Sequence, residues 1–344
     1  MVRSTARHST PARAALLAGV LLTWAAVCTG NAAPDKPSKE QPAERPDPWA
    51  RLLERGWKQL DLVNYPAAEE SFRKVRDGQP SRSQRAEALF ALGHLWQYRR
   101  PGADIDKAVE HYRQVAGEFQ DTPSSAMALM ALACLADIPE YEKDRNVGEA
   151  RRLYRRIIQE KAGSLAVHEA VLRLAMTYLE EGTDPNQSRG IRMITDHLMA
   201  HPDNVLAVAM HNQAATAYQA RGEIARAVEQ YVAADAADER AAEAELTDAE
   251  RKLPLKRRLD QLAQNRVMDA GSRASLYFRI ARLAEQKLKD YPLAVKWYER
   301  IVYEIVRDNK FYAAKLSAER CRKLARQAGA EALPHPLAGE GARP

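Results

Sequence analysis

The sequence is poor in glycine, phenylalanine and cysteine, with 16, 5 and 3 of these residues among 344. Scarce glycine, abundant alanine, and tyrosine (13) in place of phenylalanine favour close-packed helices over sheets. Apolar residues make up 46% and charged residues 28% of the chain, close to the globular average. This composition excludes wholesale disorder and a membrane-spanning bundle.

Motifs that carry chemistry are also missing. The chain has no G-x-S-x-G, no phosphate-binding glycine loop, no H-E-x-x-H and no paired-cysteine zinc spacing. His197 and His201 lie one helical turn apart and could ligate a metal with His211, but no carboxylate or cysteine falls in register with them. We therefore interpret them as packing and helix-end histidines, and we predict a non-catalytic protein without a cofactor or a metal.

The positive charge is weak and dispersed. The formal net charge of +6 includes Arg3, Arg7 and Arg13 near the amino terminus, where no acidic residue balances them. Two basic runs, residues 151–156 and 256–258, alternate with apolar residues at helical spacing. Solvated helix faces explain such runs better than a nucleic-acid site, which needs cations clustered on one face. We expect no nucleic-acid partner.

Residues 1–33 resemble a secretory signal peptide. Three arginines precede an apolar run over residues 14–27, and small residues follow it. The run is shorter than the roughly 20 residues that cross a bilayer as a helix. Cys28 offers an alternative, a lipid anchor of the bacterial lipoprotein type, although Ala25 and Val27 depart from the usual residues at those positions. We expect an exported protein, periplasmic or associated with the outer membrane, whose only membrane link would be a lipid on Cys28.

Export places the cysteines in oxidising surroundings, where a disulfide could form. If Cys28 leaves with the signal peptide, Cys134 and Cys321 remain. They fall in predicted helices at opposite ends of the chain, too far apart for the roughly 7 Å limit between bridged α-carbons. We predict two free thiols.

Both ends of the mature chain differ from its middle in composition. Residues 34–47 hold four prolines and alternating charges, which predicts a disordered tether. Residues 329–344 predict a disordered tail. A helical region occupies the chain between them.

The middle of the chain repeats one pattern six times. A small residue in one helix is followed by a small residue that opens the next helix, and a bulky residue comes four positions later. Small residues allow two helix backbones to cross closely, and the bulky residue fills the space beside them. The sets are Gly56, Ala68 and Phe72; Gly93, Ala108 and Tyr112; Ala133, Ala150 and Tyr154; Ala175, Gly190 and Ile194; Ala215, Ala227 and Tyr231; and Ala281, Ala294 and Tyr298.

This spacing resembles that of tetratricopeptide repeats, most closely over residues 214–234. The resemblance implies an all-α fold: a right-handed α-solenoid of about six helical hairpins over residues 48–310, with a capping helix over 311–328. The last interval between small residues is the longest, and residues 238–270 predict an inserted helical pair that Pro254 interrupts.

In this family the fifth and ninth positions of each first helix tend to face a concave groove that binds partners. In the first four repeats these positions hold mainly apolar side chains, which suit an amphipathic helix or an extended hydrophobic peptide. The alternative is that they pack against neighbouring hairpins. The candidate residues are Leu53, Trp57, Phe90, His94, Met130, Cys134, Leu172 and Met176.

The connection over residues 112–126 is similar to the linkers of bacterial outer-membrane assembly lipoproteins and Tol-Pal coordinators. That resemblance implies a protein–protein interaction scaffold in the cell envelope, whose partner is another protein. Two alternatives stay open: an accessory module that recruits an enzyme acting on envelope polymer, and a carbohydrate-binding solenoid. The aromatic residues Trp57, Trp96 and Tyr98 are few for a glycan site.

Overall fold

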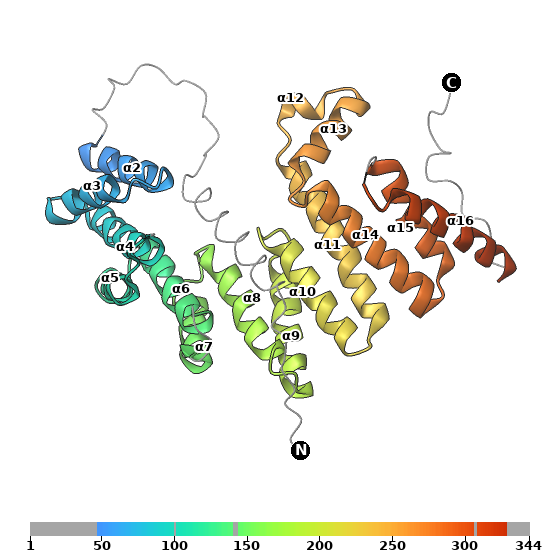
Figure 1. Cartoon of the computed structure of the whole chain (residues 1–344), viewed down its shortest axis with the longest axis horizontal. Coiled ribbons are helices and arrows are strands. Elements are labelled where there is room, and N and C mark those ends of the chain that lie inside the picture. Colours follow the sequence, from blue (N-terminus) through green and yellow to red (C-terminus); the bar gives the residue numbers. More distant parts are fainter. Residues whose placement is uncertain (1–46, 100, 140–143, 306–307, 329–344) are drawn as a thin grey trace. The chain divides into compact units, whose positions relative to one another are not determined.

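The computed structural model describes residues 47–99, 101–139, 144–305 and 308–328, and within these ranges the regular structure is helical, without a β-strand (Figure 1). The predicted signal peptide with Cys28, the predicted tether up to residue 46, and the predicted tail 329–344 lie outside the described residues. None of the described helices combines the length and the apolar character needed to cross a membrane.

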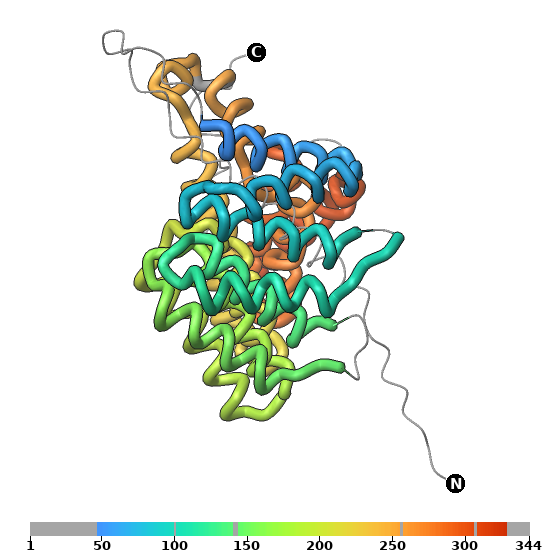
Figure 2. The backbone as a smooth tube through the Cα atoms, turned by 90° about the vertical axis from the view of Figure 1, so that its left-hand side faces the viewer, coloured from blue at the N-terminus to red at the C-terminus, as the bar shows by residue number. Residues whose placement is uncertain are grey.

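The helices form hairpins in chain order: from α2 to α11 and again from α14 to α16 each helix packs on the next one along the chain, and α11 also packs on α14 (Figures 1 and 2). The all-α solenoid of helical hairpins is thereby confirmed. The hairpins are α2 (Pro48–Asp61) with α3 (Tyr65–Asp77), α4 (Arg82–Tyr98) with α5 (Ile105–Glu118), α6 (Pro123–Asp137) with α7 (Val147–Glu160), α8 (Ala166–Leu179) with α9 (Asp184–Ala200), α10 (Ala207–Ala220) with α11 (Ile224–Ala244), and α14 (Ala270–Leu283) with α15 (Tyr291–Glu304).

Small residues form notches that receive the bulky side chains, as the repeat pattern predicts. A Cβ atom added to Gly56 would lie 2.4 Å from the ring of Phe72, and one added to Gly93 would lie 2.7 Å from the ring of Tyr112. The predicted pairing of small and bulky residues is confirmed in the first two repeats. The bulky residues of all six repeats are buried: Phe72, Tyr112, Tyr154, Ile194, Tyr231 and Tyr298.

A hydrogen-bond acceptor accompanies each of the four tyrosines in this set. The Tyr112 hydroxyl donates to Oε1 of Gln97 at 2.8 Å, and the Tyr298 hydroxyl donates to Oε2 of Glu285 at 2.9 Å. Tyr154 and Tyr231 likewise donate to Asp137 and Gln219. Each acceptor stands four residues after the small residue of its first helix, and this position holds leucine, Leu60 and Leu179, in the two repeats whose bulky residue has no hydroxyl.

The inserted segment is shorter than predicted, because α11 continues as far as Ala244 and only α12 (Asp248–Arg251) and α13 (Leu255–Asn265) separate it from α14. Arg266 ties the end of this segment to α11. Its guanidinium contacts the buried carboxylates of Asp235 and Asp238 at 3.3 and 3.2 Å, and Glu239 at 2.7 Å. Residues 238–244 therefore belong to the fifth hairpin.

Helix α16 (Phe311–Gln327) packs on α15, the last helix of the sixth hairpin. It buries Ala314, Ala318 and Cys321. Arg320 pairs with Glu285, which follows α14 in the π-helical turn η2 (Ala284–Leu288), at 2.6 Å. The capping helix is thus fixed by small apolar residues and by an ion pair to the preceding hairpin.

Gly190→Ala should destabilise the fold by about 2 kcal/mol, because the added Cβ would lie 2.8 Å from the backbone oxygen of Ala175. The matched control is Gly117→Ala in α5, where a Cβ would meet no atom within 4 Å. The control should be neutral or stabilising by up to about 1 kcal/mol. Urea unfolding midpoints measure the stability of both variants. Equal midpoints would contradict the close packing of Gly190 against the backbone of Ala175.

Gln97→Leu should destabilise the protein by about 1–3 kcal/mol, since it leaves the buried Tyr112 hydroxyl without an acceptor. Adding Tyr112→Phe should recover about 1–2 kcal/mol, because the pair then has the same two residue types as Leu60 and Phe72 in the first repeat. A double-mutant cycle by urea denaturation measures this coupling. If the destabilisations caused by Gln97→Leu and by Tyr112→Phe simply add in the double variant, the two side chains are not coupled and the prediction is wrong.

Candidate functional site

The first helices of the first four hairpins, α2, α4, α6 and α8, pack on one another in series. Their fifth positions hold buried side chains, exposed by 4–7%: Leu53, Phe90, Met130 and Leu172. Their ninth positions hold partly exposed side chains: Trp57, His94, Cys134 and Met176. Within the predicted site, the ninth positions therefore reach solvent while the fifth positions support them from below.

The aromatic members of this set are in contact with one another. The Trp57 ring lies 6.4 Å from Phe90 and 5.9 Å from His94, measured between ring centroids. His94 lies 4.5 Å from Tyr98, whose side chain is 37% exposed. The structure thus joins Trp57, Phe90, His94 and Tyr98 into one surface across α2 and α4, which we call the aromatic row.

Burial keeps the titratable members of the set uncharged at neutral pH. It lowers the pKa of His94 to about 4 and raises the pKa of the Cys134 thiol to about 11. Cys134 and Cys321 are both free. A neutral imidazole and a protonated thiol suit an apolar partner better than a charged one.

Charged residues lie next to the predicted set, and the sequence reasoning missed them. Trp57 donates its indole N–H to Oε1 of Glu87 at 3.0 Å. On α8, Nε of Arg173 and Oε1 of Glu169 form a buried ion pair at 2.6 Å. The signal was present, because these two are the only charged side chains in the otherwise apolar helix α8 and lie four residues apart. Glu87 therefore offers a fixed polar group beside Trp57, whereas the Glu169–Arg173 pair is buried within the helix packing.

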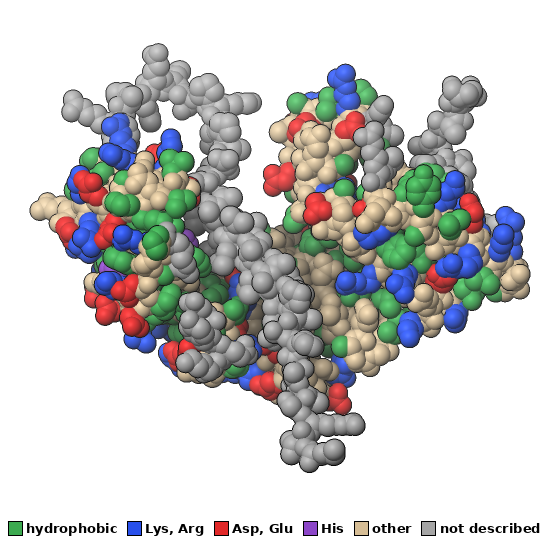
Figure 3. All heavy atoms as spheres, viewed as in Figure 1, with side chains coloured by type: hydrophobic (Ala, Val, Ile, Leu, Met, Phe, Trp, Pro, Cys, Tyr) green, Lys and Arg blue, Asp and Glu red, His purple; other side chains and the backbone are tan. Residues whose placement is uncertain are grey.

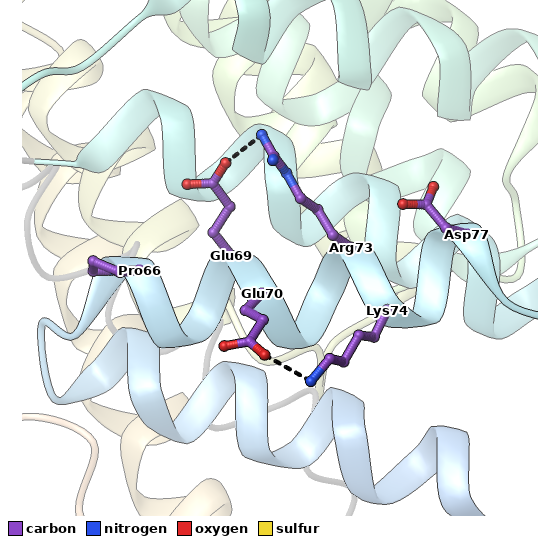
Figure 4. A pocket seen from close by; sticks show the side chains of 6 residues that line it. All are labelled: Pro66, Glu69, Glu70, Arg73, Lys74 and Asp77. Carbon is purple, nitrogen blue, oxygen red and sulfur yellow. Dashed lines mark hydrogen bonds and ion pairs between the residues drawn. The ribbon is translucent and has the colours of Figure 1, made fainter.

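Two hollows lie outside the predicted set. A shallow one on α3 is lined by the ion pairs Glu69–Arg73 and Glu70–Lys74, which run along the helix as Figure 4 shows. Its charges already satisfy one another. A larger cleft of about 550 Å³ lies between α5, α6 and α7, with Leu132 and Leu135 among its lining residues and none of the eight predicted residues.

Charge on the visible face is mixed. Figure 3 shows lysine and arginine interspersed with aspartate and glutamate over α2–α5, with basic side chains more frequent over α14–α16.

Three histidines meet where the start of α8 approaches the end of α9. Nδ1 of His168 and Nε2 of His197 lie 2.8 Å apart, and the His201 ring lies 4.7 Å from that of His197. His211, the third residue of the metal set considered from the sequence, instead bonds Gln230 at 2.8 Å. Among the described residues, no three His, Cys, Asp or Glu side chains are arranged to hold a metal ion.

No protein-family model matches the chain, and no curated protein matches its sequence. The chain is similar to a solved structure of Pseudomonas aeruginosa PilF (16% identity, TM-score 0.45, covering 78% of this chain and 96% of that one). It is also similar to PilW, described as a widely conserved type IV pilus biogenesis factor (12%, 0.46, 78% and 98%), and to a tetratricopeptide repeat protein from Parabacteroides merdae (14%, 0.39, 79% and 98%). These three TM-scores are below 0.5, so the likenesses carry no argument about function.

Mild acid should destabilise the protein through the histidine cluster. Burial and the neighbouring rings lower the pKa of His197 to about 4, and burial also lowers that of His168. The unfolded chain therefore takes up these protons first, and stability falls as the pH drops from about 6.5 toward about 4. We expect a loss of about 1 kcal/mol after allowing for solvent that reaches the rings.

Thermal unfolding at pH 7.5 and pH 5.5 measures this loss. His168→Gln combined with His197→Gln should reduce the difference between the two pH values, and the part that remains is due to other buried histidines such as His94, whereas Tyr312→Phe on the exposed face of α16 should leave the difference unchanged. An undiminished pH difference in the double variant would assign the effect to other groups.

Proposed function

We propose that the protein is a non-catalytic protein–protein interaction scaffold of the bacterial cell envelope. Its binding surface is formed by the exposed side chains of α2, α4, α6 and α8, and its partner presents an amphipathic helix or an extended apolar peptide. The observation that carries this proposal is the aromatic row, whose rings touch across two hairpins and end in the partly exposed side chains of Trp57, His94 and Tyr98.

The chemistry of the surface supports this class of partner. Aromatic side chains supply large contact areas at low entropic cost, and Met176 on α8 adds an adaptable apolar side chain. Glu87, which accepts the Trp57 indole N–H, supplies a fixed polar group nearby. A mainly apolar surface with a few anchored polar groups is typical of peptide-binding grooves.

The envelope location is proposed from residues 1–33, which have the arrangement of an export signal. We favour a periplasmic protein, and the alternative is a protein attached to the outer membrane through a lipid on Cys28.

The accessory-module alternative shares the same surface and differs only in the partner, which would be an enzyme acting on envelope polymer. The carbohydrate alternative is less favoured, because part of the ring surface that could stack on a sugar is already in contact with other side chains. Nζ of Lys107 lies 4.5 Å from the Trp96 ring centroid, and Trp57 packs against Phe72 and Phe90.

Affinity capture from envelope extract, with mass spectrometry of the retained proteins, tests the proposal. Trp57→Ala and Met176→Glu should each reduce recovery of the specific partner by at least about fivefold, as expected for residues near the centre of an interface. Met130 is unsuitable for this purpose, because it is only 4% exposed and a glutamate there would be buried.

Two substitutions of exposed residues outside the surface serve as matched controls: Tyr312→Ala on α16 and Met199→Glu on α9, whose side chains are 77% and 75% exposed. Both should retain the partner. If the controls and the surface variants lose it equally, the surface is not the binding site. A retained hydrolase or synthase would favour the accessory module, and binding to an immobilised glycan would favour the carbohydrate alternative.

A further inference from the structure

We propose that three arginines on α7 and α9 bind an acidic segment of a partner protein. This arginine cluster consists of Arg151 and Arg155 from α7 and Arg189 from α9. It surrounds Tyr178, which lies near the end of α8 and is only 3% exposed. The site is separate from the aromatic row and does not depend on the function proposed for it.

Tyr178 holds the arginines in fixed positions. The guanidinium carbon of Arg151 lies 4.0 Å from the ring centroid of Tyr178, and that of Arg189 lies 4.4 Å from it. Arg155 donates to the hydroxyl of the same tyrosine. Stacking against a buried ring reduces the freedom of a long side chain before any ligand arrives, which lowers the entropic cost of binding.

The cluster carries unbalanced positive charge. Arg151 pairs with Glu181 at 2.5 Å and donates to the backbone oxygen of Thr177 at 2.8 Å. Among the described residues, neither Arg155 nor Arg189 has a carboxylate partner, and both are exposed. Like charges held this close repel one another, so the arrangement favours a bound anion.

The geometry of the guanidinium groups points to carboxylates as that anion. A guanidinium that lies against a ring keeps its N–H groups at its edge, where they can donate two parallel hydrogen bonds to a carboxylate. Acidic side chains two residues apart on an extended peptide lie on the same side, about 7 Å from each other. Such a peptide could engage Arg155 and Arg189 together.

A nucleic acid fits less well. The other two arginines of the basic run on α7 are neutralised within the helix, Arg152 by Glu149 at 2.6 Å and Arg156 by Glu160 at 2.8 Å. Two unpaired cations are fewer than a phosphate backbone needs for stable binding at physiological salt.

Fluorescence anisotropy with the full chain and a labelled peptide of alternating glutamate and serine tests the proposal. The peptide should bind at low salt, and the same peptide with glutamine in place of glutamate should not. Arg155→Gln and Arg189→Gln should each weaken binding by about tenfold. Arg189→Lys, which keeps the charge but loses the stacked plane, should give an intermediate affinity.

Arg152→Gln is the matched control, because Arg152 lies on the same helix and is already paired with Glu149. It should change the affinity by less than about twofold. Circular dichroism and thermal unfolding verify that each variant folds, and Arg189→Lys replaces Arg189→Gln if the latter does not. The proposal is overturned if the glutamate and glutamine peptides bind equally, if Arg152→Gln weakens binding as much as Arg189→Gln, or if a short single-stranded DNA binds more tightly with the same dependence on Arg189.

Discussion

The contact on which the fold depends is the one between a small residue of one helix and a large side chain of the next. Gly56 and Gly93 show why the small residue is required, since even a methyl group would overlap the ring that packs there. The first two hairpins close by this contact, and the bulky residue at the same position is buried in the other four. Where the large side chain is tyrosine, the contact also includes a hydrogen bond, which fixes the ring within an otherwise apolar layer.

The spacing of small and large residues was enough to predict the helices and their order, because close helix crossings leave a local mark on the sequence. The acceptor position left a weaker mark. Gln97 and Leu60 look unrelated until the repeats are aligned on their small residues. The alignment then shows that glutamine occurs in a repeat whose bulky residue is tyrosine, and leucine in a repeat whose bulky residue is phenylalanine. The end of α11 could not be predicted from nearby residues. That helix continues to Ala244, and it is contacted by Arg266, which lies more than twenty residues further along the chain.

The candidate surface was predictable in its positions and not in its exposure. Periodicity places Leu53 and Trp57 on the same side of α2, but only the neighbouring helix decides that Leu53 is covered and Trp57 reaches solvent. The same reason explains the histidines. His197 and His201 were visible as neighbours on one helix, whereas His168 joins them from α8 and could be identified only once the hairpin had closed.

Arginine illustrates how far side-chain chemistry depends on partners that sequence spacing does not show. Arg152 and Arg156 behave as the pattern of their helix predicts, each paired with a glutamate three or four residues away. Arg151 and Arg155 belong to the same run, yet they turn toward Tyr178 on the following helix, where Arg189 meets them. One run of basic residues therefore separates into a solvated half and a half held against an aromatic ring, and only the second half keeps positive charge in fixed positions for a ligand to neutralise.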